Sequence, residues 1–271
     1  MSTAADWVPS DIDVAIPSAA RVYDYLLGGA HNFDADRLVG EKVLAAQPNG
    51  RQIARSNRAF MSRAVRFMVA NGIRQFLDLG SGIPTVGNTH EIAQHADPDC
   101  RIVYVDHDPI AVAHSQLTLA RNPLATVVNA DLTDPKSLLK NSTVRKFIDF
   151  DKPIGLLLVA VFHFVPDEKN PAAIVTKYRD AIPAGSYVAI SHLTADRMAE
   201  EMAGVAEAMK HSRDPMYFRS YPDVAALFDG LDVVEPGVVS APLWRPDYGD
   251  DLGQQGVYAG VGRTRRAGEQ S

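Results

Sequence analysis

Short apolar runs alternate with segments of helical periodicity between residues 74 and 192, and this alternation restricts the fold more than any other feature. Runs that are apolar throughout fit strands buried on both faces, and not strands with one solvated face. The expected strands are 74–79, 101–105, 125–129, 154–162 and 186–192, and the expected helices between them are 86–96, 109–120, 135–140 and 171–182. Strands that alternate with helices predict a parallel sheet that is covered on both faces.

Further helices and strands flank this core. Residues 17–46 read as a helical segment that the pair Gly28-Gly29 interrupts, and 51–71 read as a third helix. Beyond the fifth strand we expect helices at 196–211 and 222–228 and closing strands at 231–239 and 256–261. The sequence therefore predicts an α/β fold: a doubly wound, mostly parallel, seven-stranded Rossmann-like sheet with an N-terminal helical cap.

The chain of 271 residues is expected to form one folded unit, because chains split into domains mainly beyond about 250–300 residues. Within it we distinguish an N-terminal arm and helical cap (1–72), an α/β domain (73–262) and a polar tail (263–271). Segment 195–221 is a candidate substrate cap, because Met198, Met202, Val205 and Met209 recur at helical spacing. A methionine surface adapts to varied ligands, but core packing is the alternative for this stripe.

Composition limits the compartment and the partners. The net charge of −6 does not favour a nucleic-acid-binding surface. Cys100 is the single cysteine, which fits a reducing compartment and excludes an intrachain disulfide. The N-terminus lacks the basic start and apolar run of a secretory signal, and the longest apolar run, 154–162, is shorter than the ~20 residues that span a bilayer. We expect a cytoplasmic protein with a small-molecule partner and no nucleic-acid or membrane partner.

A glycine turn follows the first predicted strand. Asp78 lies near the end of that strand, and Gly80, Ser81 and Gly82 precede a helix. Such a turn lets the backbone approach a ligand closely, and a helix N-terminus favours polar or negative groups. A tight turn that carries glycine only for packing is the alternative.

Acidic residues follow the next two strands. Asp106 ends the second strand, where a carboxylate can accept hydrogen bonds from ribose hydroxyls, and His107 follows in the same loop. Asp131 and Leu132 follow the third strand, where a carboxylate and a backbone amide could pair with adenine. A solvated loop position is the alternative for Asp106, and a helix N-cap is the alternative for Asp131.

This order of strands and acids resembles the class I methyltransferases that use S-adenosyl-L-methionine. Thr85 stands where a dinucleotide-binding turn has its third small residue, which argues against NAD or FAD. Residues 21–29 (RVYDYLLGG), with Asn32-Phe33 and Asp36-Arg37, resemble the N-terminal signature of a bacterial S-adenosylmethionine-dependent methyltransferase family formerly catalogued as a domain of unknown function. Segments 78–85, 104–109 and 234–237 belong to the same pattern, so the resemblance covers about residues 17–262.

The resemblance implies S-adenosylmethionine as cofactor and no particular substrate. Tyr23, Asn32 and Phe33 are expected to form a lid, with aromatic faces near the sulfonium and the Asn32 amide on the amino-acid part of the cofactor. Arg21 is a candidate contact for the cofactor carboxylate. Helix packing and an ion pair are the alternatives for these residues. A non-catalytic binder of S-adenosylmethionine or S-adenosylhomocysteine and a nucleotide-dependent oxidoreductase are the alternative functions.

Methyl transfer depends mainly on alignment and exclusion of water, so no single catalytic side chain is obligatory. His163, just past the fourth strand, is the candidate base for a hydroxyl or amine acceptor, and a histidine satisfied in the pocket wall is the alternative. His192, at the end of the fifth strand, is a weaker candidate. No metal is expected, because His90 and His95 are five residues apart and a zinc helix needs four.

Overall fold

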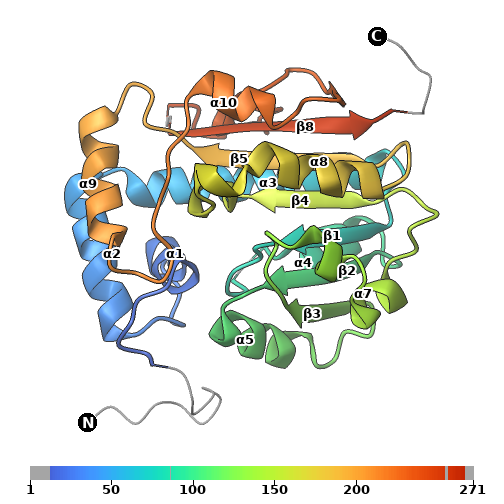
Figure 1. Ribbon diagram of the computed structural model, residues 1–271, viewed down its shortest axis with the longest axis horizontal. Helices are drawn as coiled ribbons and strands as arrows, with labels where there is room; N and C mark the ends of the chain where they lie inside the picture. The colour runs from blue at the N-terminus through green and yellow to red at the C-terminus, as the bar shows by residue number, and fades with distance from the viewer. Residues whose placement is uncertain (1–12, 86, 254–255, 266–271) are drawn as a thin grey trace.

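The computed structural model describes residues 13–85, 87–253 and 256–265. Within these residues an eight-stranded sheet has the strand order β3-β2-β1-β4-β5-β8-β6, with β7 paired to β8 (Figure 1). The pairs among the first five strands are parallel, and β8 runs antiparallel to its neighbours. The strands are β1 (Gln75–Leu79), β2 (Arg101–Asp106), β3 (Ala125–Asn129), β4 (Gly155–Val159), β5 (Tyr187–Leu193), β6 (Leu231–Val233), β7 (Val239–Ser240) and β8 (Val257–Thr264).

Helices cover both faces of this sheet. On one face lie α3 (Gly50–Ala70), α4 (Thr89–Ala96), α5 (Pro109–Leu119) and the 3-10 turn η3 (Ala241–Leu243). On the other lie α6 (Pro135–Leu138), α7 (Ser142–Phe147) and α8 (Pro171–Ala181). Alternate residues of β1 enter the two cores, with Phe76 facing α3 and Leu77 facing α8. The predicted Rossmann-like fold with a mostly parallel sheet is confirmed.

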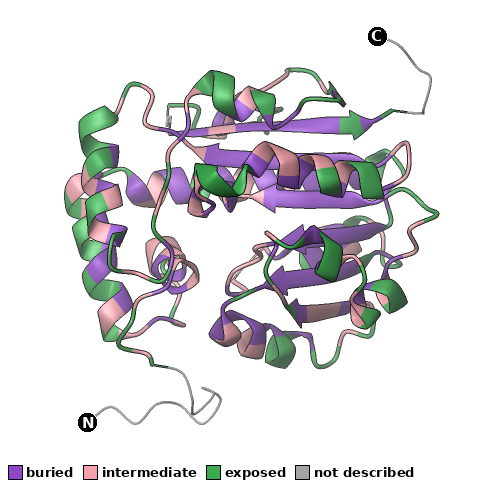
Figure 2. Ribbon diagram, viewed as in Figure 1, coloured by how far each residue is buried: buried purple, intermediate pink, exposed green. Residues whose placement is uncertain are grey.

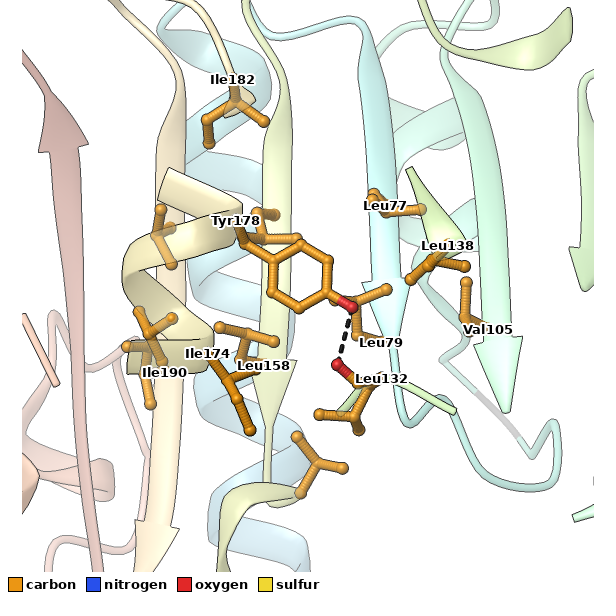
Figure 3. Close-up of a cluster of buried hydrophobic side chains, with 14 of the residues drawn as sticks. Leu77, Leu79, Val105, Leu132, Leu138, Leu158, Ile174, Tyr178, Ile182 and Ile190 are labelled. Atoms are coloured by element: carbon orange, nitrogen blue, oxygen red, sulfur yellow. Dashed lines mark hydrogen bonds between the residues drawn. The ribbon is translucent and has the colours of Figure 1, made fainter. Parts of the chain in front are cut away.

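A buried tyrosine ties the second core to the end of the sheet. The hydroxyl of Tyr178 on α8 donates a hydrogen bond to the Leu132 carbonyl oxygen at 2.8 Å (Figure 3). The ring packs among Leu79, Leu158 and Ile174 in the same apolar cluster. This hydrogen bond therefore attaches the loop after β3 to α8.

Three predicted elements differ from the structure. The predicted strand 231–239 is divided into β6 and β7 by a turn in which Gly237 N donates to the Val234 carbonyl, since Pro236 has no N–H for a ladder. The predicted strand 154–162 ends at Val159, because Ala160 adopts φ +53° and a 3-10 turn, η1 (Phe162–Phe164), follows. The predicted helix 135–140 is shorter, and α7 after it was missed although the Asn141 side chain caps it.

The remaining helices form a layer beside the carboxyl ends of the parallel strands. We call α1 (Ala19–Leu27), α2 (Asp34–Ala46) and α9 (Ala199–Met209) the cap; α9 lies against α2 at the left of Figure 1. Their inward sides are buried and their outward sides are exposed (Figure 2). The apolar centre of the cap contains Val22, Val39, Val43, Met202, Val205 and Met209. The short helix α10 (Tyr221–Ala226) precedes β6, and η2 (Asp167–Lys169) precedes α8.

Two predicted segments extend beyond the described residues. Residues 1–12 of the predicted arm and 266–271 of the predicted tail lie outside them, as does residue 86, where a helix was expected to begin. That helix, α4, begins at Thr89 after an Asn88 capping box with Glu91. Among the described helices, none combines the length and apolar character that a membrane crossing needs.

Candidate active site

A cavity of about 540 Å³ lies between the carboxyl ends of the parallel strands and the cap. Its floor is the glycine turn after β1 and the loops after β2, β3 and β4. Its roof is the cap together with residues 210–220, which connect α9 to α10 and which we call the strap. Of the predicted site residues, the cavity lining includes Tyr23, Asp78, Gly80, Ser81, Gly82, Asp106, His107, Asp131, Leu132 and His163.

The glycine turn has the conformation that the sequence predicts. Gly80 and Gly82 have φ of +71° and +66°, in the left-handed region that favours glycine. A Cβ atom at Gly80 would lie 2.2 Å from Cγ2 of Val161, so a larger residue cannot fit there. The Ser81 hydroxyl is buried and has no hydrogen-bond partner among the described residues. The turn therefore leaves a polar atom for a ligand.

Asp106 connects two loops of the floor. Its Oδ2 accepts a hydrogen bond from Gly82 N at 2.7 Å, and its Oδ1 accepts one from Asp108 N at 2.8 Å. Burial raises the pKa of this carboxyl group. Asp108, which belongs to the 104–109 motif but was not named as a site residue, also lines the cavity; its Oδ1 caps α5, and its buried Oδ2 has no partner within the described chain. A carboxylate oxygen can accept more than one hydrogen bond, so both residues retain acceptor capacity.

Asp78 and Arg58, which carry opposite charges, both line the cavity beside the glycine turn. Asp78 accepts a hydrogen bond from the Thr89 hydroxyl at 2.7 Å, and burial raises its pKa to about 6. Arg58, on α3, lines the same part of the cavity and donates to the Gly87 carbonyl at 2.7 Å. Arg58 could not be predicted from the sequence, because only tertiary packing brings α3 next to the turn.

Asp131 and Leu132 lie at the far end of the floor. Asp131 accepts hydrogen bonds from the backbone and hydroxyl of Thr133, at 2.7 and 2.8 Å. The N-cap of α6 is Asp134, so the alternative interpretation of Asp131 as a helix cap is wrong. Lys169 from η2 lies 3.9 Å from the Asp131 carboxylate. The two predicted residues therefore face the cavity next to a lysine.

His107 connects the floor to the roof. Its Nε2 lies 3.0 Å from Oδ1 of Asp214 in the strap, and this ion pair raises the His107 pKa to about 9. The other oxygen of Asp214 accepts a hydrogen bond from Ala19 N at 2.9 Å. One carboxylate thus links the loop after β2, the strap and the start of α1.

The N-terminal signature is divided between the cavity and the interior of the cap. Tyr23 lines the cavity; its hydroxyl donates to the Ala54 carbonyl at 3.1 Å and accepts from the Asn57 amide at 3.0 Å. Arg21 and Asn32 are not among the lining residues that the structure describes. The expected lid thus meets the cavity through Tyr23.

Arg21 and Asn32 instead hold α1 and α2 together. The Arg21 guanidinium is buried and lies 3.3 Å from the Asp36 carboxylate. The Asn32 amide donates to buried Asp24 at 2.8 Å, and a Cβ atom at Gly29 would lie 2.0 Å from the same carboxylate. The alternative of packing and an ion pair therefore describes these two side chains.

The two candidate histidines differ in their surroundings. His163 lines the cavity, burial holds its pKa well below the usual value, and its Nδ1 accepts a 3.4 Å hydrogen bond from Leu193 N. No described residue forms a hydrogen bond with its Nε2. His192 is buried, with Nε2 at 2.8 Å from the Arg219 guanidinium and Nδ1 at 2.6 Å from the Leu193 carbonyl. His192 is thus satisfied within the protein, whereas His163 retains a ring nitrogen.

Residues 5–265 match the model of a family described as S-adenosyl methyltransferase. The chain belongs to the S-adenosyl methyltransferase family. The resemblance in its motifs is thereby confirmed: this is an S-adenosylmethionine-dependent methyltransferase with S-adenosyl-L-methionine as its cofactor. The oxidoreductase alternative is set aside.

Two solved structures are similar to this methyltransferase over nearly their whole length. A DUF574 family protein from Streptomyces avermitilis is 38% identical, with a TM-score of 0.89 and coverage of 93% of this chain and 99% of that one. A protein from Thermobifida fusca, described as a candidate methyltransferase, is also 38% identical, with a TM-score of 0.90 and coverage of 97% and 100%. No curated protein matches the chain.

A more distant structure shares the fold. The N-methyltransferase NodS from Bradyrhizobium japonicum, in complex with S-adenosyl-L-homocysteine, is 13% identical, with a TM-score of 0.51 and coverage of 91% of this methyltransferase and 100% of that chain. The cavity of this methyltransferase fits the cofactor on its own residues. Unpartnered buried oxygens at Ser81 and Asp108, and a turn that admits no side chain at Gly80, suit a ligand with several polar groups.

Proposed function

We propose that this methyltransferase methylates a small-molecule acceptor held between the glycine turn and the cap. The observation that carries the proposal is the continuous cavity of about 540 Å³ between a polar floor and the apolar side chains of the cap helices. Cavities of roughly 300–1,000 Å³ are typical of small-molecule sites. When bound, S-adenosylmethionine supplies an electrophilic methyl group, and the protein holds the acceptor in line with it and excludes water.

The floor residues are assigned to the cofactor. Asp106 accepts hydrogen bonds from the ribose hydroxyls, and Asp131 and Leu132 pair with adenine. Asp78 and Arg58 bind the ammonium and carboxylate of the amino-acid part, since they present opposite charges beside the glycine turn. Arg58 thus replaces Arg21 in the role of carboxylate contact, because Arg21 is engaged with Asp36 inside the cap.

His163 is assigned to the acceptor as a general base. Because Nδ1 accepts a hydrogen bond from Leu193, the ring proton in this arrangement is on Nε2. A base at Nε2 needs the other tautomer, with the proton on Nδ1, and this 3.4 Å hydrogen bond is the long, weak contact that the tautomer gives up. The lowered pKa keeps the ring neutral at pH 7, as a base requires.

Calorimetric titration tests the cofactor half of the proposal. Wild type is expected to bind S-adenosylmethionine, and Asp106→Ala is expected to bind it about 1–3 kcal/mol more weakly, since a buried polar pairing is lost. NAD is the control ligand. An Asp106→Ala variant with unchanged affinity would overturn the ribose assignment.

Turnover tests the acceptor half. Small metabolites are incubated with enzyme and S-adenosylmethionine, and formation of S-adenosylhomocysteine is measured. Turnover with nucleic acid but with no small molecule would contradict the proposal. The cytoplasmic location stays a prediction from composition.

A further inference from the structure

The helices of the cap line the cavity with uncharged side chains. Val22 on α1, Val43 on α2, and Met202, Val205 and Met209 on α9 face the cavity, and Phe164 of η1 lies beside them. In the described part of the chain, α1, α2 and α9 contribute no charged residue to the lining. Met202, Val205 and Met209 of the methionine stripe therefore do two things: they pack the core of the cap, and they form a wall of the cavity.

The charges around the cavity belong to other regions. Several lie beside the glycine turn and in the loops after β2, β3 and β4: Arg58, Asp78, Asp106, Asp108, Asp131 and Lys169. In the strap, Asp214 is paired with His107. The neighbouring Arg213 directs its guanidinium to the Asp13 carbonyl at 3.3 Å. An acceptor charge placed against α1, α2 and α9 would therefore meet no charged side chain of these helices, and burial of an unpaired ion is strongly unfavourable.

The uncharged polar side chains near the cap are largely satisfied by other protein groups. Tyr23 and Asn57 share a hydrogen bond, and Oδ1 of Asn57 accepts from the Ser191 hydroxyl at 2.5 Å. Gln47 accepts from Asn49 N at 3.2 Å through its side-chain oxygen. Nε2 of His163 is the ring atom left for a ligand among these described side chains. The loop after β4 thus presents this one ring nitrogen beside the apolar side chains of the cap.

We infer that the acceptor is an uncharged, mainly apolar molecule whose single hydroxyl or amine group lies against Nε2 of His163. The inference rests on the proposed function. In the transfer, a lone pair of the acceptor oxygen or nitrogen forms the bond to the methyl carbon. The carbon–sulfur bond breaks with its electron pair left on sulfur, and the acceptor proton moves to Nε2 of His163, whose own ring proton is on Nδ1 in the reacting tautomer. Uncharged acceptor and sulfonium thus yield a methylated product, a thioether and a protonated histidine.

A neutral fluorescent probe, N-phenyl-1-naphthylamine, tests this in the full chain. We expect saturable binding with one probe per chain. A matched pair of competitors then separates charge from size: 2-naphthol should displace the probe at a concentration at least tenfold lower than 2-naphthoate at pH 7. Equal or stronger displacement by 2-naphthoate would overturn the inference, as would no binding of the probe.

Substitutions locate the probe. Val205→Phe fills the roof without adding charge and should weaken probe binding at least tenfold while the affinity for S-adenosylmethionine stays unchanged. Leu38→Phe, on the exposed side of α2, is the matched control and should change neither. Val22→Phe tests the opposite wall if Val205→Phe does not fold. Unaltered probe binding in the folded roof variants would refute the inference.

The two proposals fail in different ways. Loss of S-adenosylmethionine binding in wild type would contradict the proposed function. Normal S-adenosylmethionine binding, together with preference for the charged competitor, would contradict only the acceptor class.

Discussion

His107 and Asp214 form an ion pair, with Nε2 of the imidazole 3.0 Å from Oδ1 of the carboxylate, that joins the cofactor loop to the strap over the cavity. The same carboxylate accepts the backbone N–H of Ala19 at the start of α1. Three segments that are distant in sequence thus meet at one side chain. Protonation of His107 adds a charge–charge attraction to this link between the floor and the strap.

The His107–Asp214 pair predicts a pH-dependent stability. The His107 pKa is raised from 6.5 to about 9, so its contribution is complete below pH 6.5 and is lost as the pH rises through 9. The pKa of Asp214 is lowered, so its contribution is lost only as the pH falls through the acid range. Thermal unfolding of wild type and Asp214→Asn should differ at pH 6 and converge above pH 9. A difference that is constant over this range would contradict the prediction.

Asp78 predicts proton linkage in cofactor binding. Its pKa of about 6 in the free protein should fall when the cofactor ammonium lies beside it, because a nearby positive charge favours the carboxylate. Binding below pH 6 must then release a proton, so affinity should decrease as the pH falls from 7 to 5. Calorimetry in two buffers of different ionisation enthalpy measures the release. Asp78→Asn should bind more weakly and lose this part of the pH dependence; an unchanged proton release would refute the assignment.

Alanine substitutions at Gly80 and Gly82 should both reduce stability, but by different amounts. Both have positive φ, so alanine at either position costs about 1–2 kcal/mol of backbone strain. A Cβ at Gly80 also meets Val161, whereas one at Gly82 has no heavy atom within 4 Å. In denaturant unfolding, Gly80→Ala should therefore destabilise more than Gly82→Ala, and Val161→Ala should partly rescue it. Equal losses would show that the collision relaxes.

Substitution of Arg21 and of Arg58 should affect different properties: stability in the first case and cofactor binding in the second. Removing buried Arg21 leaves Asp36 without its charged partner, which typically costs about 3–5 kcal/mol, so Arg21→Met should lower stability and leave cofactor affinity unchanged in the folded fraction. Arg58→Met should weaken S-adenosylmethionine binding at least tenfold. Denaturant unfolding and calorimetry on both variants separate the roles. Weaker cofactor binding by folded Arg21→Met would restore the role that the sequence suggested for Arg21.

The contrast between these arginines shows how far the sequence could predict the site. Gly80, Asp106 and Asp131 were predictable, since parallel strands place their carboxyl-end residues along one edge, whatever the details of packing. Arg58 and Asp214 were not, because they reach the cavity from a helix and a strap whose positions depend on tertiary contacts. The signature around Arg21 identified the family correctly, yet its side chain is buried in the cap. A family pattern thus records packing as well as ligand contact.

His163 predicts a specific pH profile for methyl transfer. Because burial and the positive Arg219 nearby lower its pKa, the neutral base is present throughout the neutral range, and turnover should be flat from pH 6 to 8 as far as this group determines it. His163→Gln retains a polar side chain but cannot take the proton. It should lower kcat by about 10²–10⁴-fold, the usual range for a general base, with a smaller effect on acceptor KM. Cofactor affinity is the control for folding, and it should be unchanged in this variant. A His163→Gln enzyme with normal kcat would assign His163 to the wall of the cavity and leave alignment by the cap and glycine turn as the basis of catalysis.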